Sequence, residues 1–116
     1  MNPRLTLVLA VLALAGCAND PAPNEQMRLT VQAVEQALAV GADPQLEEMR
    51  EAERKLARAE KNMGEEDYKR ARVFAEQAEL DARLAEAKVL NQKSQKQLDE
   101  LNARLTRLRQ QLGELP

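Results

Sequence analysis

The feature that most constrains this chain is a long stretch without helix-breaking residues. Residues 65–112 contain neither proline nor glycine. Alanine, leucine, glutamate, arginine and glutamine dominate the stretch, and all of them favour the α-helix. We therefore expect one helix of up to about 48 residues, about 70 Å long at 1.5 Å per residue. No β-sheet is expected, because aromatic residues make up only 2% of the chain and β-branched residues are few.

Prolines and glycines divide the preceding residues into two shorter helices. The first is expected to start at Asn24, which serves as its N-cap, and to close at Gly41 in the left-handed conformation. Asp43 and Pro44 form a typical start for the second helix, which is expected to end at Gly64.

The third helix is expected to start directly after Gly64, because residues 65–67 (Glu-Glu-Asp) suit the positive end of a helix dipole. Short connections between the helices favour antiparallel neighbours. The expected fold class is all-α, with an antiparallel three-helix bundle over residues 24–90. An extended, coiled-coil-like part of the third helix follows over residues 91–116. The two shorter helices are long enough to cover the third only to about residue 83.

Apolar residues at alternating steps of three and four mark the expected core face of each helix. The series are Met27, Val31, Val34 and Leu38 in the first helix, Met49, Ala52, Leu56, Ala59 and Met63 in the second, and Leu80, Leu84 and Ala87 in the third.

The C-terminal part of the third helix carries a further apolar pattern, which we call the leucine tip. Its members follow strict heptad spacing and are Leu98, Leu101, Leu105, Leu108 and Leu112. Residues 91–97 (NQKSQKQ) before it are wholly polar, and in the same register the pattern continues backward through Ser94 and Asn91. An exposed leucine stripe implies a protein partner, and a second copy of the chain is the simplest one. The alternative is that the third helix bends back or that its end frays without a partner.

The N-terminal residues have the layout of a secretory signal peptide. A short basic start containing Arg4 precedes an apolar run over residues 5–14. A run of about ten residues is too short to span a bilayer, which takes about 20 residues as a helix. Residues 1–16 are therefore expected to be a signal peptide that takes no part in the fold.

Residues 14–17 (Leu-Ala-Gly-Cys) resemble the bacterial lipobox. This resemblance implies cleavage between Gly16 and Cys17 and attachment of lipid to the Cys17 thiol. Several acyl chains on one residue bind a bilayer far more firmly than a single chain. Ala18 differs from the aspartate that usually retains lipoproteins in the inner membrane, so we expect the outer membrane, facing the periplasm. Residues 17–23 then form the lipidated cysteine and a short tether.

The sequence lacks the residues that most chemistry requires. It contains no histidine, which is the commonest general base and metal ligand. With Cys17 acylated, no thiolate is left for catalysis or zinc. The formal net charge of -2, without a basic cluster, gives no reason to bind nucleic acid. We expect no enzyme activity, no metal, no small-molecule substrate and no cofactor other than the covalent lipid on Cys17.

Residues 52–89 resemble the bacterial family known as domain of unknown function 4398. The segment combines an A-x-x-K-L-x-x-A helix, a turn before Asp67 and Tyr68, and a D-A-R-L-A-E-A run that starts at Asp81. The resemblance implies a small envelope lipoprotein, and the family supplies no catalytic residues.

Two functions are therefore expected from the sequence. In the first, the protein is an outer-membrane-anchored structural or spacer lipoprotein that self-associates through the leucine tip. In the second, it is a monomeric accessory lipoprotein that docks a different envelope, transport or cell-wall assembly protein. The two differ in whether the leucine tip pairs with itself.

Overall fold

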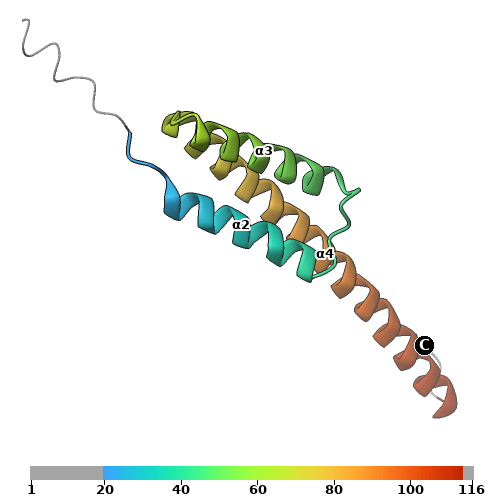
Figure 1. Ribbon diagram of the computed structural model, residues 1–116. Helices are drawn as coiled ribbons and strands as arrows, with labels where there is room; N and C mark the ends of the chain where they lie inside the picture. Colours follow the sequence, from blue (N-terminus) through green and yellow to red (C-terminus); the bar gives the residue numbers. More distant parts are fainter. Residues whose placement is uncertain (1–19, 114–116) are drawn as a thin grey trace, which may run out of the picture.

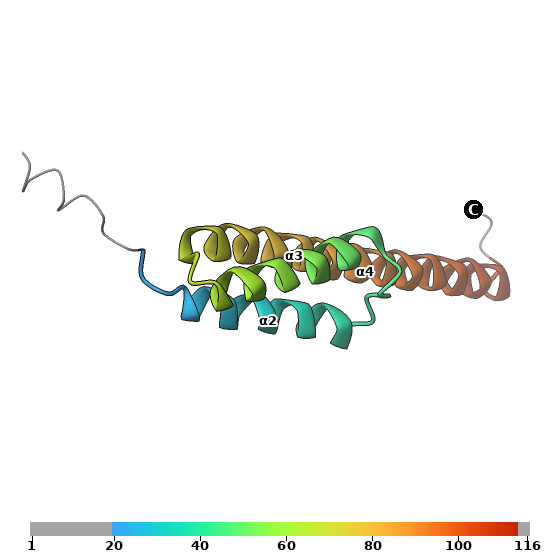
Figure 2. The same cartoon turned by 45° about the horizontal axis from the view of Figure 1, so that its top comes forward.

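The computed structural model describes residues 20–113, which form three α-helices and no β-strand (Figure 1). The helices are α2 (Asn24–Ala39), α3 (Glu47–Gly64) and α4 (Tyr68–Gln111). α2 and α4 run in one direction and α3 runs in the other, while the end of α4 extends beyond both (Figure 2). This confirms the predicted fold class, an antiparallel three-helix bundle with a long C-terminal helix.

The core of the bundle is built mainly from small residues. α4 contributes only alanines that are fully buried: Ala71, Ala75, Ala78, Ala82 and Ala85. α3 contributes Met49, Ala52 and Ala59, and α2 contributes Thr30, Ala33, Val34 and Ala37. Met49 and Thr30 are the largest side chains that are fully buried. Small side chains allow the three helix backbones to lie close together, which is why α4 carries an alanine seam at its centre.

The core face predicted for α4 was wrong. Leu80 and Leu84 are 67% and 48% exposed, and Ala87 is exposed as well. Ala78 and Ala82 lie two residues earlier, about 200° around the helix, and occupy the core instead. A leucine in place of Ala78 or Ala82 would not fit, because the helix backbones lie close together and the core between them is already filled.

The core faces predicted for the other two helices were partly right. In α3, Met49, Ala52 and Ala59 are buried as predicted. In α2, Val34 is buried, but Val31 and Leu38 are 37% and 40% exposed. Thr30, Ala33 and Ala37 are buried in their place, and Thr30 contacts α4 directly.

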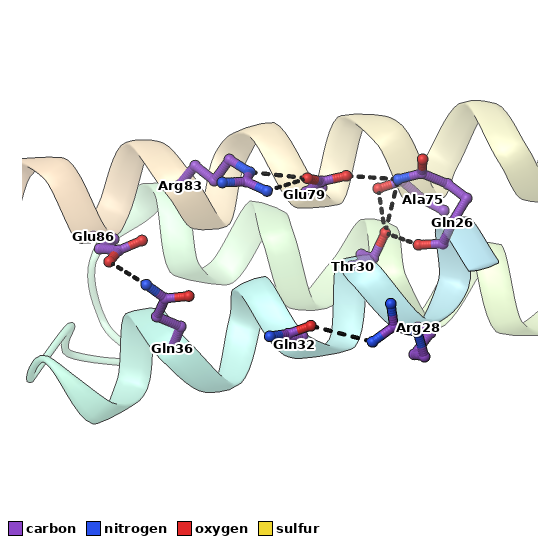
Figure 3. Close-up of polar contacts among 9 residues, drawn as sticks. All are labelled: Gln26, Arg28, Thr30, Gln32, Gln36, Ala75, Glu79, Arg83 and Glu86. Atoms are coloured by element: carbon purple, nitrogen blue, oxygen red, sulfur yellow. Dashed lines mark hydrogen bonds and ion pairs between the residues drawn. The ribbon is translucent and has the colours of Figure 1, made fainter.

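Thr30 joins α2 to α4 through a buried polar contact (Figure 3). Its hydroxyl oxygen lies 2.9 Å from the carbonyl oxygen of Ala75 and 2.8 Å from that of Gln26. The Gln26 amide donates to Glu79 on α4 at 2.7 Å and to the Thr30 hydroxyl at 3.3 Å. Further along, the Gln36 amide donates to Glu86 at 2.9 Å. These contacts fix the register of α2 along α4, because each donor reaches only one position on the neighbouring helix.

Ion pairs fix the register of α3 along α4. Lys55 Nζ lies 2.5 Å from Asp81 Oδ2, and both side chains are about three-quarters buried. Lys88 of α4 forms a second ion pair with Glu48 near the start of α3. Lys55 and Asp81 both belong to the segment whose pattern resembles a known family, and the structure shows that they form an interhelical contact.

Both interhelical turns close with a residue in the left-handed conformation, but only one of these residues is glycine. Gly41 (φ +94°) closes α2 as predicted, with Ala42 N donating to Ala37 O at 2.9 Å. After α3 the same role falls to Glu66 (φ 58°), with Asp67 N donating to Asn62 O at 2.9 Å. α3 ends at Gly64 as predicted, and the left-handed residue in the turn that follows is Glu66, which the sequence did not indicate.

The starts of the helices also differ from the predictions. Asn24 is the first residue of α2 rather than its N-cap, which is Pro23. Asp43 does not cap α3, which begins at Glu47; its carboxylate accepts from Gln45 N at 2.7 Å within the connecting turn. α4 begins at Tyr68, where Asp67 accepts from Arg70 N at 3.1 Å. The acidic residues 65–67 therefore precede the first turn of α4, because they form the turn that connects α3 to α4.

The bundle covers more of α4 than the predicted limit near residue 83. Val89 packs against the core cluster, and Lys93 Nζ donates to Val40 O at 2.6 Å. The extra length is covered by the connection between α2 and α3, in which Ala42 is buried and Leu46 is partly buried.

The two glycines at the ends of α2 and α3 predict opposite effects of the same substitution. Gly64→Ala should raise the free energy of unfolding by about 0.8 kcal/mol, because Gly64 is helical and an added Cβ meets nothing within 4 Å. Gly41→Ala should lower it by about 1–2 kcal/mol, because Gly41 has a positive φ. Urea unfolding of both variants tests this, and a loss of stability in Gly64→Ala contradicts the assigned turn.

The two faces of α4 predict a second contrast. Ala78→Leu should destabilise the fold by about 1–3 kcal/mol through overpacking. At a protein concentration low enough for the chain to be monomeric, Leu80→Ala should change the stability by less than about 0.5 kcal/mol, because Leu80 faces solvent in the single chain. Ala57→Leu on the exposed side of α3 is the control for added volume. A large loss in Leu80→Ala with no loss in Ala78→Leu would restore the core face that the sequence predicts.

Candidate functional site

The leucine tip lies on the part of α4 that extends beyond the bundle (Figure 1). Every residue from 90 to 113 is exposed, and α4 continues without a break to Gln111. The helix therefore neither bends back onto the bundle nor ends early. The five leucines of the tip, Leu98, Leu101, Leu105, Leu108 and Leu112, are between 50% and 74% exposed.

A second group of exposed apolar residues lies on the part of α4 inside the bundle. We call this group, Val73, Leu80 and Leu84, the bundle seam. Val73 is 43% exposed, and the two leucines point away from α2 and α3. Val73 was not predicted to be a surface residue, although the heptad pattern of the tip reaches it when it is extended backward beyond Leu80. The bundle seam and the leucine tip lie on the same face of α4, because they share one heptad register.

Polar residues separate the two groups. Asn91 and Ser94 occupy heptad positions between the bundle seam and the leucine tip, and both are exposed. The exposed face of α4 therefore has an apolar part at each end and a polar part at its centre.

A groove beside the connection between α2 and α3 is lined by lysines but already serves the fold. Its walls include Lys88, Lys93 and Lys96. Lys88 is paired with Glu48, and Lys93 caps the C-terminal carbonyl of Val40. A cation at a helix C-terminus is favourable, so these contacts are explained by the stability of the bundle.

Two carboxylates that form interhelical contacts to or from α4, Glu48 and Glu79, are suited to a structural role rather than to proton transfer. The Gln26 amide, together with Arg83, holds the pKa of Glu79 below its usual value. A hydrogen bond from Lys88 likewise lowers the pKa of Glu48. A carboxylate with a lowered pKa is charged at neutral pH and carries no proton to donate, so neither group is arranged as a general acid.

The predicted lipidation site lies outside the described residues. Gly16 and Cys17 precede residue 20, so the structure gives no contact for them. Within residues 20–113, no group of three or more cysteine, aspartate or glutamate residues is placed to hold a metal ion. Among the described helices, none is long and apolar enough to cross a membrane.

Two comparisons identify relatives of this chain. The model of the family described as domain of unknown function (DUF4398) matches residues 25–101, which include all of the bundle and part of the leucine tip. A crystal structure of a DUF4398 family protein from Pseudomonas aeruginosa PAO1 is similar, with 63% sequence identity and a TM-score of 0.78. The similarity covers 81% of this chain and 98% of that one. No curated protein matches the chain.

The family match covers well over half of the chain, and the similar crystal structure has the same fold at high identity. Both agree with the resemblance of residues 52–89 that the sequence indicates. The chain belongs to the DUF4398 family.

Proposed function

We propose that this protein is a lipoprotein anchored in the outer membrane through Cys17, facing the periplasm, with a non-catalytic structural role. It self-associates through the leucine tip. The observation that carries the proposal is the row of half-exposed leucines on a continuous helix that extends beyond its own bundle.

An unpartnered helix with exposed leucines gains much from association. Residues 90–113 make almost no contact with the bundle, so this part of α4 lacks the tertiary packing that supplies most of the stability of helices in proteins. Full burial of a leucine side chain stabilises by about 1.5–3 kcal/mol, so covering the exposed half of each leucine contributes about 1 kcal/mol. A second copy carries the same apolar pattern and supplies this cover without any other component.

The anchor is supported by the sequence of residues 5–17. The apolar run, the small residues before Cys17 and the single cysteine fit a lipoprotein signal better than a structural thiol, because an unpaired cysteine in an exported chain has no disulfide partner. Residues 17–23 then connect the lipid to the start of α2, which lies beside the start of α4 (Figure 1).

The alternative function is an adaptor. In that case the protein is a monomeric lipoprotein, and its leucine tip docks a different envelope, transport or cell-wall assembly protein. The same exposed leucines favour this function, so only the oligomeric state separates the two.

Substitution of Cys17 tests the anchor. The full chain, expressed in a Gram-negative bacterium, should incorporate labelled palmitate and sediment with the outer membrane, whereas Cys17→Ser should remain unlabelled. Ala18→Asp should keep the label but move the protein to the inner-membrane fraction. Labelling of Cys17→Ser, or no labelling of the unsubstituted chain, contradicts lipidation at this site.

The self-association test uses a fragment of residues 18–116, which contains every described helix. A similar Pseudomonas chain that corresponds to 81% of this one crystallised in the same fold, so we expect a fragment that contains all three helices to fold. Sedimentation equilibrium should show an oligomer for the fragment and a monomer for Leu101→Gln with Leu105→Gln. Ala103→Gln, which lies on the opposite side of α4, should leave the oligomer intact. If the unsubstituted fragment is monomeric, self-association is wrong and the adaptor function replaces it.

A further inference from the structure

The exposed face of α4 is longer than the leucine tip. Its heptad positions run from Val73 to Leu112 in alternating steps of four and three, and every one of them is exposed. Leu80 lies two residues after buried Ala78, and Leu84 two residues after buried Ala82. Two residues turn a helix by about 200°, so this face is directly opposite the alanine seam that contacts α2 and α3. α4 therefore has one face for its own bundle and another that no residue between 20 and 113 covers.

The exposed face is long enough for a coiled coil. A secure coiled coil needs about three or four heptads, and residues 73–112 exceed that length. The leucine tip alone does not. The bundle seam must therefore take part in any coiled-coil pairing of this helix.

The charges that flank the face oppose a parallel, in-register pair. The first core position of each heptad, called a, falls at residues 77, 84, 91, 98, 105 and 112. In a parallel pair, the residue just before an a position faces the residue five positions further along the other copy. The charged pairs that result are Glu76 with Asp81, Arg83 with Lys88, and Arg104 with Arg109. Each pair carries like charges and occurs twice in the dimer. Asp81 and Lys88 already pair with Lys55 and Glu48 of α3, so the repulsion between Arg104 and Arg109 is the one that no ion pair with the bundle offsets. A parallel pair matches every polar and every apolar position of the face with itself, so the flanking charges, and not the core layers, oppose this arrangement.

An antiparallel pair matches the polar and apolar positions of the two copies when Asn91 of one copy faces Ser94 of the other. Leu84 then faces Leu101, and Leu80 faces Leu105. The remaining layers pair Val73 with Leu112 and Ala87 with Leu98, leaving only Gln77 opposite Leu108 as a mismatch. Polar residues thus meet polar residues at the centre, and apolar residues meet apolar residues on both sides.

The flanking charges are also better placed in the antiparallel pair. Arg83 facing Arg104 is the only like-charged pair in this register. Arg83 lies 2.6 Å from Glu79 on its own helix, which offsets its charge. Glu100 precedes Arg104 by one turn, the spacing at which an acid and a base on a helix attract.

We propose that a second copy of this chain binds along the exposed face of α4 in the antiparallel orientation, with the leucine tip of each copy on the bundle seam of the other. This rests on the proposed self-association and specifies its geometry. The bundles lie at opposite ends of the pair, and each α4 contacts α2 and α3 on one side and the second copy on the other.

Disulfide cross-linking of residues 18–116 tests the orientation. This fragment lacks Cys17, the only cysteine of the chain, so introduced cysteines have no competitor. A tagged Leu84→Cys variant mixed with untagged Leu101→Cys should form a disulfide-linked heterodimer under mild oxidation. Each variant alone should cross-link at least tenfold less, because its two cysteines lie about 26 Å apart in the proposed pair. Leu80→Cys with Leu105→Cys provides a second, independent pair, and Ala103→Cys should cross-link with neither partner.

The outcomes separate this inference from the proposed function. Strong cross-linking of Leu101→Cys with itself shows a parallel pair and overturns the orientation. Preferential cross-linking of Leu84→Cys with Ser94→Cys shows a register shifted by one heptad and overturns the pairing of Asn91 with Ser94. If sedimentation shows an oligomer and neither proposed pair cross-links, the geometry fails while self-association stands. A monomer in sedimentation overturns both.

Discussion

The close approach of α4 to its two neighbours is the constraint on which the rest of the structure depends. It is made possible by alanines, and it brings the Thr30 hydroxyl within 2.9 Å of a backbone carbonyl on α4. A larger residue in the alanine seam would separate the helices and break this contact together with the one between Gln26 and Glu79. The position of α2 along α4 therefore depends on side chains that are themselves too small to form specific contacts.

A core made of small residues has a second consequence. Each buried alanine removes little apolar surface from water, so the bundle obtains less hydrophobic stabilisation than a leucine core of the same length. Its leucines are displaced to the surface of α4, where Leu80 and Leu84 remain about half or more exposed. The same packing that makes the bundle narrow therefore creates the exposed face of α4. Because alanines give little side-chain specificity, the ion pair of Lys55 with Asp81 sets the register of α3 along α4.

Helix number, direction and approximate length could be predicted from sequence, because prolines, glycines and composition act locally. The core face of α4 could not, since two heptad series coexist in it. One series contains Ala78 and Ala82, and the other contains Leu80 and Leu84. The larger residues are the usual choice for a core, and only the distance between the packed helices reverses that choice. The end of α3 at Gly64 could also be predicted, but the left-handed conformation of Glu66 in the following turn could not, because a glutamate rarely adopts it. The leucine tip was easier to find, because no other helix competes for it.

The proposed orientation changes what an anchored pair of these proteins can do. A single chain with its N-terminus at the membrane can hold the leucine tip away from the surface, since α2 and α4 start at the same end (Figure 2). In the antiparallel pair the start of α4 in one copy and the start of α4 in the other lie about 70 Å apart, at opposite ends of the rod. A tether of about seven residues spans at most about 25 Å, so if both copies carry the lipid proposed for Cys17, both lipids enter one membrane only when the rod lies along its surface. The proposed anchor and the proposed orientation together therefore describe a bar along the membrane rather than a spacer standing away from it. The orientation of the pair, rather than self-association itself, decides between these two structural roles.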